Sequence, residues 1–343
     1  MKCLLAIFAL IISSPSLAYN NLISYLDNNI NFEGRYFDVK QGRAFDWGRT
    51  KISFNTNAKE IIFLLKGGKA NYNLAIDNVL VNTITTKADQ VKYSYKLDGK
   101  EHYIALTRRN DSHYGEAIFQ GVELVGGQLL SPPKPFTRKL EWIGDSWFSG
   151  YGVEGESRKC KNLRSVENAE KALPSIVSNR LNAQMHLISI SGKGVVRNYG
   201  HPYKSAPNAL PNYYHQATAK RRDSYWQHSK FQADAAIINL GRNDYTTTPH
   251  PDDDVWIAIY QKLIGTIERA HNKAIPIFII YDPTMEKLAK QLDVLATKEN
   301  ITFITIDSMK KDEYGCHAHP KVSAHLRWAD NAEKVIREGL DWN

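Results

Sequence analysis

The stretch EWIGDSWFSGYG, residues 141–152, guides the interpretation of the rest of the chain. A short apolar run ends at Ile143, Gly144-Asp145-Ser146 follows directly, and two more glycines close the stretch. A strand that ends in a tight turn places a small hydroxyl residue at the carboxyl end of a sheet, where α/β enzymes assemble their sites. The pattern therefore makes Ser146 a candidate nucleophile. Serine and aspartate also form ordinary turns, so this tripeptide alone leaves a plain loop open.

The first 18 residues have the features of a signal peptide. Lys2 supplies a charged start, residues 3–12 are apolar, and the small-residue sequence SLA at 16–18 suits cleavage. This apolar run is too short to cross a bilayer, and no later run is long enough. We therefore expect a soluble mature chain that begins near Tyr19, is secreted or periplasmic, and has no membrane span.

Length and composition indicate two globular domains. The chain has 343 residues, of which 43% are hydrophobic, and this is enough for two sizeable cores. Its net charge of +8 is spread thinly, and the longest block of like charges is KRR at 220–222. Such a balance is typical of a solvated basic surface, so we expect no nucleic-acid partner.

Two cysteines, Cys160 and Cys316, remain once Cys3 is removed with the signal peptide. In an oxidising compartment an even pair is a candidate disulfide. The alternative is two unpaired thiols, and the disulfide is the preferred interpretation.

The first half of the mature chain consists of short alternating segments separated by turn residues. These segments lie at 50–54, 60–65, 72–76, 79–84, 91–97, 102–106 and 117–124. Strands at this spacing predict a β-sandwich over residues 19–131, with a packing role, because its charged residues are scattered. The proline-rich sequence SPPKP at 131–135 cannot continue a central strand or a helix, and it predicts a linker over 132–138.

After the linker, the sequence pattern changes to predicted strands that alternate with predicted helices. Strands are expected at 139–143, 184–190, 235–240, 275–281 and 301–306, and helices at 174–181, 255–271, 288–295 and 322–336. The run AAIINL at 235–240 is continuously apolar, as in a central parallel strand. Regular alternation of this kind predicts a parallel three-layer α/β domain over residues 139–343.

Polar residues follow the predicted strands at the end where such a sheet collects its site. Ser146 follows the first strand, SGKG at 191–194 the second, and GRND at 241–244 the third; the last strand leads to CHAHP at 316–320. Serine needs a base to become nucleophilic, and histidine is the usual base near neutral pH, which makes His319 the candidate.

Acyl transfer also needs donors aimed at the oxyanion. A glycine lets its backbone N–H approach substrate closely, which favours Gly192, with Gly194 as the alternative, and Asn243 offers a side-chain donor. His317 and His319 would need further ligands to bind a metal, and no spacing supplies them. We therefore expect neither a metal nor a cofactor.

With these residues in place, the chain resembles the GDSL/SGNH hydrolases, whose four sequence blocks supply Ser, Gly, Asn and His. The matching positions are Ser146, Gly192, Asn243 and His319. The resemblance is closer to the family two carbohydrate esterases and covers essentially the whole mature chain. The motifs that carry it are IGDSWFSGYGVEGE at 143–156, SGKGVVRNYG at 191–200 and GRNDY at 241–245. It implies an α/β fold class in which a jelly-roll domain precedes an SGNH-type three-layer α/β/α domain.

One position departs from the family pattern. Relatives usually carry Asp two residues before the catalytic histidine, and here that position is His317. Such a carboxylate orients the base and stabilises its imidazolium. The resemblance therefore implies a Ser146–His319 dyad, oriented by a backbone carbonyl or by a nearby acid such as Asp312. Whether His317 acts as a third catalytic residue beside Ser146 and His319 stays open.

The resemblance implies an exported serine esterase that removes O-acetyl groups from polysaccharides of the xylan or glucomannan type, through an acetyl-enzyme on Ser146. Two alternatives remain. One is an esterase acting on bacterial or host glycans or on small acyl esters, and the other is a carbohydrate-binding protein with a weakened site. Trp147, Tyr245 and Trp226 are candidates for stacking on sugar rings, although core packing is the preferred interpretation for each one.

Overall fold

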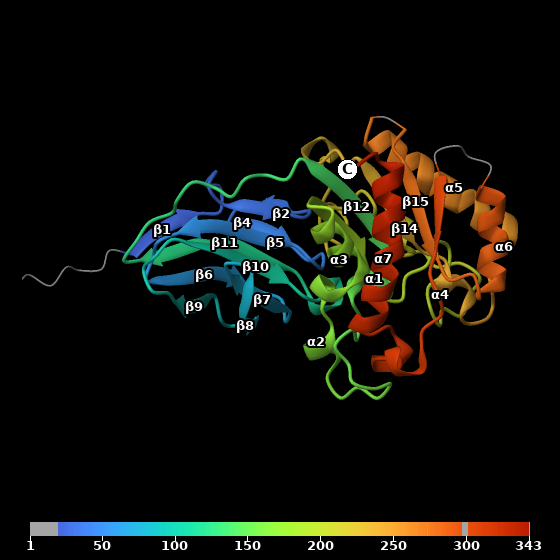
Figure 1. Ribbon diagram of the computed structural model, residues 1–343, viewed down its shortest axis with the longest axis horizontal. Helices are drawn as coiled ribbons and strands as arrows, with labels where there is room; N and C mark the ends of the chain where they lie inside the picture. Colours follow the sequence, from blue (N-terminus) through green and yellow to red (C-terminus); the bar gives the residue numbers. More distant parts are fainter. Residues whose placement is uncertain (1–19, 273, 297–300, 343) are drawn as a thin grey trace, which may run out of the picture.

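The computed structural model describes residues 20–272, 274–296 and 301–342. The expected signal peptide, residues 1–18, lies outside these ranges. Two bodies lie side by side along the long axis of the molecule, an N-terminal one built of strands and a C-terminal one of strands and helices (Figure 1). In the described ranges, no helix combines the length and the apolar character that crossing a bilayer requires.

The N-terminal body is a sandwich of two antiparallel sheets, as expected. One sheet has the order β3-β4-β11-β6-β9, with β1 paired to β11, and the other has the order β2-β5-β10-β7-β8. Their bounds are β1 Asn20–Ser24, β2 Asn31–Glu33, β3 Phe37–Val39, β4 Gly42–Phe45, β5 Lys51–Thr56, β6 Glu60–Lys66, β7 Asn71–Ile76, β8 Val79–Thr85, β9 Lys92–Lys96, β10 His102–Arg108 and β11 Ala117–Val125. Alternate side chains of both sheets form the core between them.

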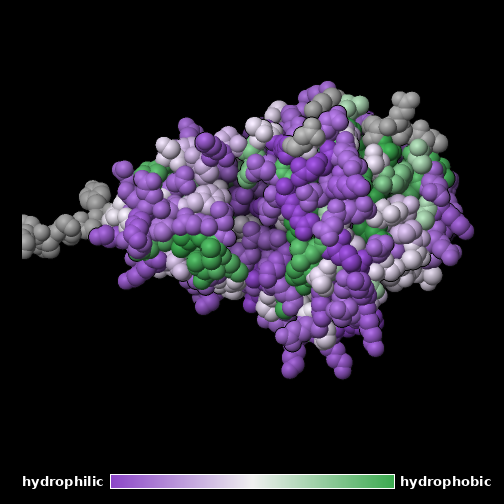
Figure 2. Space-filling view, viewed as in Figure 1, coloured by the Kyte–Doolittle hydropathy of each residue, from purple (hydrophilic) through white to green (hydrophobic). Residues whose placement is uncertain are grey.

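The surface of the molecule is mostly hydrophilic on the face shown in Figure 2, with smaller apolar patches. Among the exposed apolar side chains are Val79, Leu80 and Val81, which belong to the edge strand β8. This arrangement is ordinary for a globular protein, because much of any protein surface is apolar.

The C-terminal body contains a parallel five-stranded sheet of order β13-β12-β14-β15-β16. Its strands are β12 Arg138–Gly144, β13 Ala183–Ser189, β14 Ala235–Asn239, β15 Ile277–Tyr281 and β16 Ile301–Thr305. Because β14 is covered on both faces, it is apolar almost throughout, whereas β12 carries the charged residues Arg138, Lys139 and Glu141. β12 begins at Arg138, the last residue of the predicted linker.

Helices cover both faces of this sheet (Figure 1). One face packs against α3 (Leu173–Arg180) and α7 (Val322–Gly339), and the other against α5 (Asp253–Ala270) and α6 (Glu286–Leu295). Short α-helices are α1 Ser146–Ser149, α2 Leu163–Val166 and α4 Arg242–Tyr245, and 3-10 turns lie at Ser112–Tyr114, Ala169–Lys171, Leu210–Tyr213, His228–Lys230, Lys311–Glu313 and Cys316–Ala318. The result is the predicted three-layer α/β domain.

Buried polar contacts join the two domains. Arg35 of the β-sandwich forms a 2.9 Å ion pair with Glu141 of β12, and both side chains are almost fully buried. Asp46 accepts hydrogen bonds from the backbone N–H groups of Ala219 and Lys220, each at 2.8 Å. Leaving a buried charge unpaired is costly, so these contacts hold the domains in one arrangement.

Candidate active site

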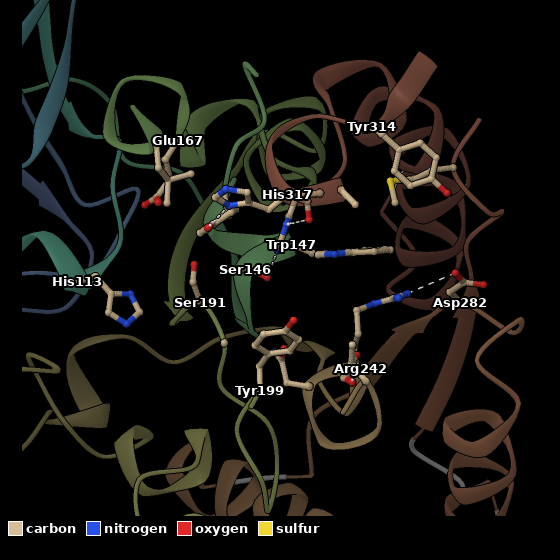
Figure 3. A pocket seen from close by; sticks show the side chains of 18 of the residues that line it. His113, Ser146, Trp147, Glu167, Ser191, Tyr199, Arg242, Asp282, Tyr314 and His317 are labelled. Atoms are coloured by element: carbon tan, nitrogen blue, oxygen red, sulfur yellow. Dashed lines mark hydrogen bonds and ion pairs between the residues drawn. The ribbon is translucent and has the colours of Figure 1, made fainter. Parts of the chain in front are cut away.

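A cleft of about 980 Å³ opens at the carboxyl ends of the parallel strands. Ser146, Gly192, Asn243 and His319, which are far apart in the sequence, all line it. Figure 3 shows Ser146 at this cleft. The N-terminal body also contributes to the lining of this cleft, through His113 and Tyr114. The structure thus brings the four predicted residues together at the predicted edge of the sheet.

Ser146 is the first residue of α1, directly after β12. Asp145 caps this helix, because its Oδ1 accepts the Trp147 N–H at 3.0 Å, and the left-handed Gly150 ends it after one turn. The Asp145 carboxyl is fully buried, and this burial raises its pKa to about 6. The strand-turn-helix geometry therefore follows from the GDS sequence and presents the Ser146 hydroxyl at the cleft.

His319 lies within hydrogen-bonding distance of the serine, with its Nε2 2.8 Å from Ser146 Oγ. On its other side, Nδ1 lies 3.2 Å from the backbone carbonyl oxygen of His317. If Nδ1–H donates to this carbonyl, the Nε2 lone pair can accept the serine proton. Burial lowers the pKa of His319 to about 4, so the imidazole is neutral and can act as a base near pH 7.

The His317 side chain does not orient the base. His317 and Ala318 both adopt left-handed backbone conformations, with φ of 51° and 61°. In this turn the His317 carbonyl faces His319, whereas the imidazole Nδ1 lies 2.7 Å from the Tyr151 hydroxyl. Asp312, the suggested acidic orienter, is exposed and makes no hydrogen bond to His319 within the described ranges. Nor do the described residues include three or more His, Cys, Asp or Glu side chains grouped to hold a metal ion.

Ser146 and Gly192 both line the cleft, and each carries a backbone N–H. Gly192 has φ of +79°, a conformation that favours glycine, although a Cβ there would meet no atom within 4 Å. Neither the Gly192 N–H nor the Ser146 N–H donates a hydrogen bond to another described residue. Gly194 is packed against Asp244 and does not line the cleft.

The Asn243 side chain is held in place by two hydrogen bonds. Its Nδ2 donates to Asp145 Oδ2 at 3.0 Å and to the Lys193 carbonyl at 2.8 Å. Both amide hydrogens are therefore engaged, and a substrate oxygen would have to share one of them. The amide also links the serine turn to the loop that carries Gly192.

The three aromatic candidates have different environments. Trp147 lines the cleft, but it stacks on Trp328 with ring centroids 5.0 Å apart, and the Arg242 guanidinium lies 3.9 Å from its ring centroid. Tyr245 and Trp226 are buried, with only 7% and 6% of their surface exposed, and neither lines the cleft. These two rings fill the cores beside them.

Some contributors to the site escaped the sequence analysis. Tyr199, which is 59% exposed, lines the cleft within the SGKGVVRNYG run. Asp244 is buried and accepts the backbone N–H groups of residues 195–197 at 2.8–2.9 Å, which fixes the loop after β13. Asp244 directly follows Asn243 in the GRND motif, and this position could have drawn attention to it. The loop whose N–H groups it accepts, however, lies about 50 residues earlier in the chain.

Cys160 and Cys316 form a disulfide, with their Cα atoms 5.3 Å apart. Because Cys316 lies in the 3-10 turn before His319, the disulfide ties the base loop to the segment that follows the nucleophile turn.

Replacing both cysteines by serine is expected to lower the free energy of unfolding by about 5 kcal/mol in the chain-entropy model, or less if the open chain retains structure. The reason is that the bond closes a segment of 156 residues. Urea unfolding of the oxidised wild type and of the double variant measures the difference, and the reduced wild type serves as control. Two free thiols in unreduced protein, detected by mass spectrometry, would disprove the pairing.

Comparisons with known proteins agree with this architecture. Residues 32–133 match the family model described as carbohydrate esterase 2 N-terminal. The cellulase/esterase CelE of Acetivibrio thermocellus is 27% identical over 333 residues, which cover 91% of this chain but only 40% of CelE. An acetylxylan esterase/glucomannan deacetylase of Cellvibrio japonicus is 23% identical, with 93% of this chain and 91% of that protein covered.

A solved structure shares the complete fold. The family two carbohydrate esterase of Clostridium thermocellum, in complex with cellohexaose, superposes with a TM-score of 0.84 at 24% identity, covering 92% of this chain and 100% of that one. The family model accounts for the first domain, and this superposition extends the likeness to the second. Across both domains, the chain therefore resembles the family two carbohydrate esterases of the GDSL/SGNH hydrolase superfamily.

Proposed function

We propose that this protein is a serine esterase that removes O-acetyl groups from polysaccharides of the xylan or glucomannan type. The observation that carries the proposal is the 2.8 Å contact between Ser146 Oγ and His319 Nε2, in a cleft shared with Gly192 and Asn243. A hydroxyl, a neutral base and nearby donors are the groups that acyl transfer needs.

In the proposed first step, Ser146 Oγ attacks the acetyl carbonyl carbon while His319 Nε2 takes its proton. The carbonyl oxygen becomes an oxyanion that accepts hydrogen bonds from the N–H groups of Ser146 and Gly192 and from Asn243 Nδ2. The carbon–oxygen bond to the sugar then breaks, and His319 returns the proton to the leaving sugar oxygen.

In the second step, His319 Nε2 takes a proton from water while the water oxygen attacks the acetyl carbonyl carbon. The bond from this carbon to Ser146 Oγ then breaks, His319 returns the proton to Ser146 Oγ, and acetate leaves. Throughout both steps the Nδ1–H of His319 donates to the His317 carbonyl. A neutral carbonyl stabilises the imidazolium less than a carboxylate would, but it holds the ring in the required orientation. The proposal is thus a dyad with a backbone orienter.

The substrate class rests on the cleft and on the relatives. A volume of about 980 Å³ is far larger than one acetyl group and lies at the upper end of the range for small-molecule sites. The C. japonicus relative is named for acetylxylan and glucomannan, and the C. thermocellum structure holds cellohexaose. We also propose export to the secreted or periplasmic space, which agrees with a disulfide in the fold.

Acetate release from a panel of substrates tests the proposal. The panel contains acetylated xylan, acetylated glucomannan, an acetylated bacterial glycan and p-nitrophenyl acetate. The proposal predicts turnover of p-nitrophenyl acetate and faster acetate release from one of the two plant polymers than from the bacterial glycan. The opposite order would favour the glycan esterase alternative, and no turnover of any member would indicate a binding protein.

Asn243→Ala is expected to lower kcat by about 10²–10³-fold with little change in KM, because an oxyanion donor acts mainly in the transition state. Asn198→Ala is the matched control, because this asparagine lies in the loop after β13, hydrogen-bonds Asn208 at 2.6 Å and does not line the cleft. Initial rates at varied acetyl ester concentrations separate the two constants. If only KM changes, Asn243 binds substrate and does not stabilise the oxyanion.

A further inference from the structure

A carboxylate of the β-sandwich reaches the loop that carries Gly192. Asp111 lies just after β10 and is fully buried. Its Oδ2 accepts the backbone N–H of Ser191 at 3.0 Å, across the domain boundary and from 80 residues away in the sequence. Ser191 directly precedes Gly192, so the acceptor sits one peptide unit from the proposed oxyanion donor.

Asp111 is itself rigidly held. Its Oδ1 accepts the His113 N–H at 2.9 Å, and its own backbone N–H donates to Glu167 Oε1 at 2.7 Å. Although burial alone raises the pKa of Asp111, the hydrogen bond and charge of His113, together with the Ser191 N–H, lower it to about 2. The ionised carboxylate is therefore a strong acceptor at neutral pH. Figure 3 shows His113, Glu167 and Ser191 grouped on one side of the cleft.

Contacts from three other residues anchor the loop after β13, and one of them is the hydrogen bond from Asn243 Nδ2 to the Lys193 carbonyl at 2.8 Å. Asp244, from the same domain, caps residues 195–197 at its far end. At its near end, the Ser191 N–H donates to Asp111 Oδ2, and the backbone of Gly192 makes a single hydrogen bond to another described residue, in which its carbonyl accepts the Tyr199 N–H at 2.9 Å. A glycine at φ of +79° has wide conformational freedom, so its N–H direction depends on such anchors.

We propose that Asp111 is a positioning residue of the esterase, which sets residues 191–193 so that the Gly192 N–H faces the acetyl carbonyl. The β-sandwich thereby takes part in catalysis through one carboxylate, beyond its role in packing. The inference rests on the proposed function in one respect: it assigns the positioned N–H to the oxyanion of an ester.

The chain offers a matched control in Asp46. Asp46 and Asp111 belong to the same domain, both are fully buried, and both accept backbone N–H groups across the domain boundary. Asp46, however, caps Ala219 and Lys220, which do not line the cleft. Substituting Asn in either place replaces one carboxylate oxygen by a donor, so both variants lose a comparable contact across the boundary.

Asp111→Asn is expected to lower kcat by about 10–100-fold while KM stays within about threefold. The reason is that a misplaced donor stabilises the transition state less but changes substrate binding little. Asp46→Asn is expected to keep kcat within about twofold. If Asp111→Asn does not fold, Asp111→Ser takes its place, because serine can still cap the 3-10 turn but leaves Ser191 N–H without its carboxylate. Equal kcat values for the Asp111 and Asp46 variants would overturn the proposal.

Hydrogen exchange gives a readout that does not depend on activity. Peptides that cover residues 189–194 are expected to exchange faster in Asp111→Asn than in wild type, and Asp46→Asn is expected to leave these peptides unchanged. Unchanged exchange in Asp111→Asn would also overturn the positioning role. If the wild type hydrolyses no acetyl ester, the proposed function fails, while the exchange experiment still decides whether Asp111 holds the loop.

Discussion

Ser146→Ala is expected to lower kcat for an acetyl ester by roughly 10³-fold or more while the protein stays folded. The reason is that Ser146 Oγ is the hydroxyl that His319 Nε2 approaches to 2.8 Å, in a cleft that Gly192 also lines. Without this oxygen no acetyl-enzyme forms, and the residual rate comes from oxyanion stabilisation and binding alone. The measurement is the initial rate of acetate release at saturating substrate.

Ser149→Ala is the matched control for this prediction. Ser149 lies in the same short helix and is fully buried, but its hydroxyl binds Ser189 Oγ at 3.0 Å and does not line the cleft. Its loss should lower stability and leave kcat near the wild-type value. Near-normal turnover by a folded Ser146→Ala variant would remove the serine from the mechanism.

The two histidines of the base loop are expected to differ sharply. His319→Ala should lower kcat by about 10³-fold or more, since no other base among the described residues hydrogen-bonds the serine hydroxyl. His317→Ala should retain most activity, because the group that orients His319 is the His317 backbone carbonyl, which the substitution keeps. Steady-state rates of both variants test this difference, and a His317→Ala variant as inactive as His319→Ala would mean that the imidazole is a working third member.

The pH dependence of kcat/KM in the wild type tests the assignment of His319 as the base. Burial holds the pKa of His319 at about 4, so its neutral form prevails above that value and is lost as the pH falls through it. We therefore expect kcat/KM to stay level from neutral pH to about pH 5 and to fall below that, since kcat/KM reports the free enzyme. An acid limb centred near the ordinary histidine pKa of about 6.5 would contradict this environment.

Periodicity predicted most of the fold because the relevant signals are local. Alternating strands in the sandwich and continuous apolar strands in the parallel sheet begin and end within about two residues of the predicted positions, since burial on one or both faces sets each pattern. The strands between residues 20 and 45 were not predicted. They have only three to five residues each, too few for a period to show.

The site was predictable only as far as its parts follow strand ends. Ser146, Gly192, Asn243 and His319 lie where chain order in a parallel sheet places them. The contact between Asp111 and Ser191 depends on how the two domains dock, and no local sequence pattern predicts this docking. The burial of Tyr245 and Trp226 likewise follows from tertiary packing, because an aromatic residue near a motif suits a core as well as a sugar platform.

The most direct test of the proposed mechanism is labelling with a p-nitrophenyl alkylphosphonate, followed by peptide mapping. An activated serine displaces p-nitrophenolate from phosphorus and keeps a stable phosphonyl group, which marks the nucleophile without relying on a short-lived acetyl-enzyme. We expect one phosphonyl group per chain, on Ser146, and loss of acetate release in proportion to labelling. Acetate release that stops with the label on another residue, or that continues after Ser146 is fully labelled, would contradict the proposed mechanism.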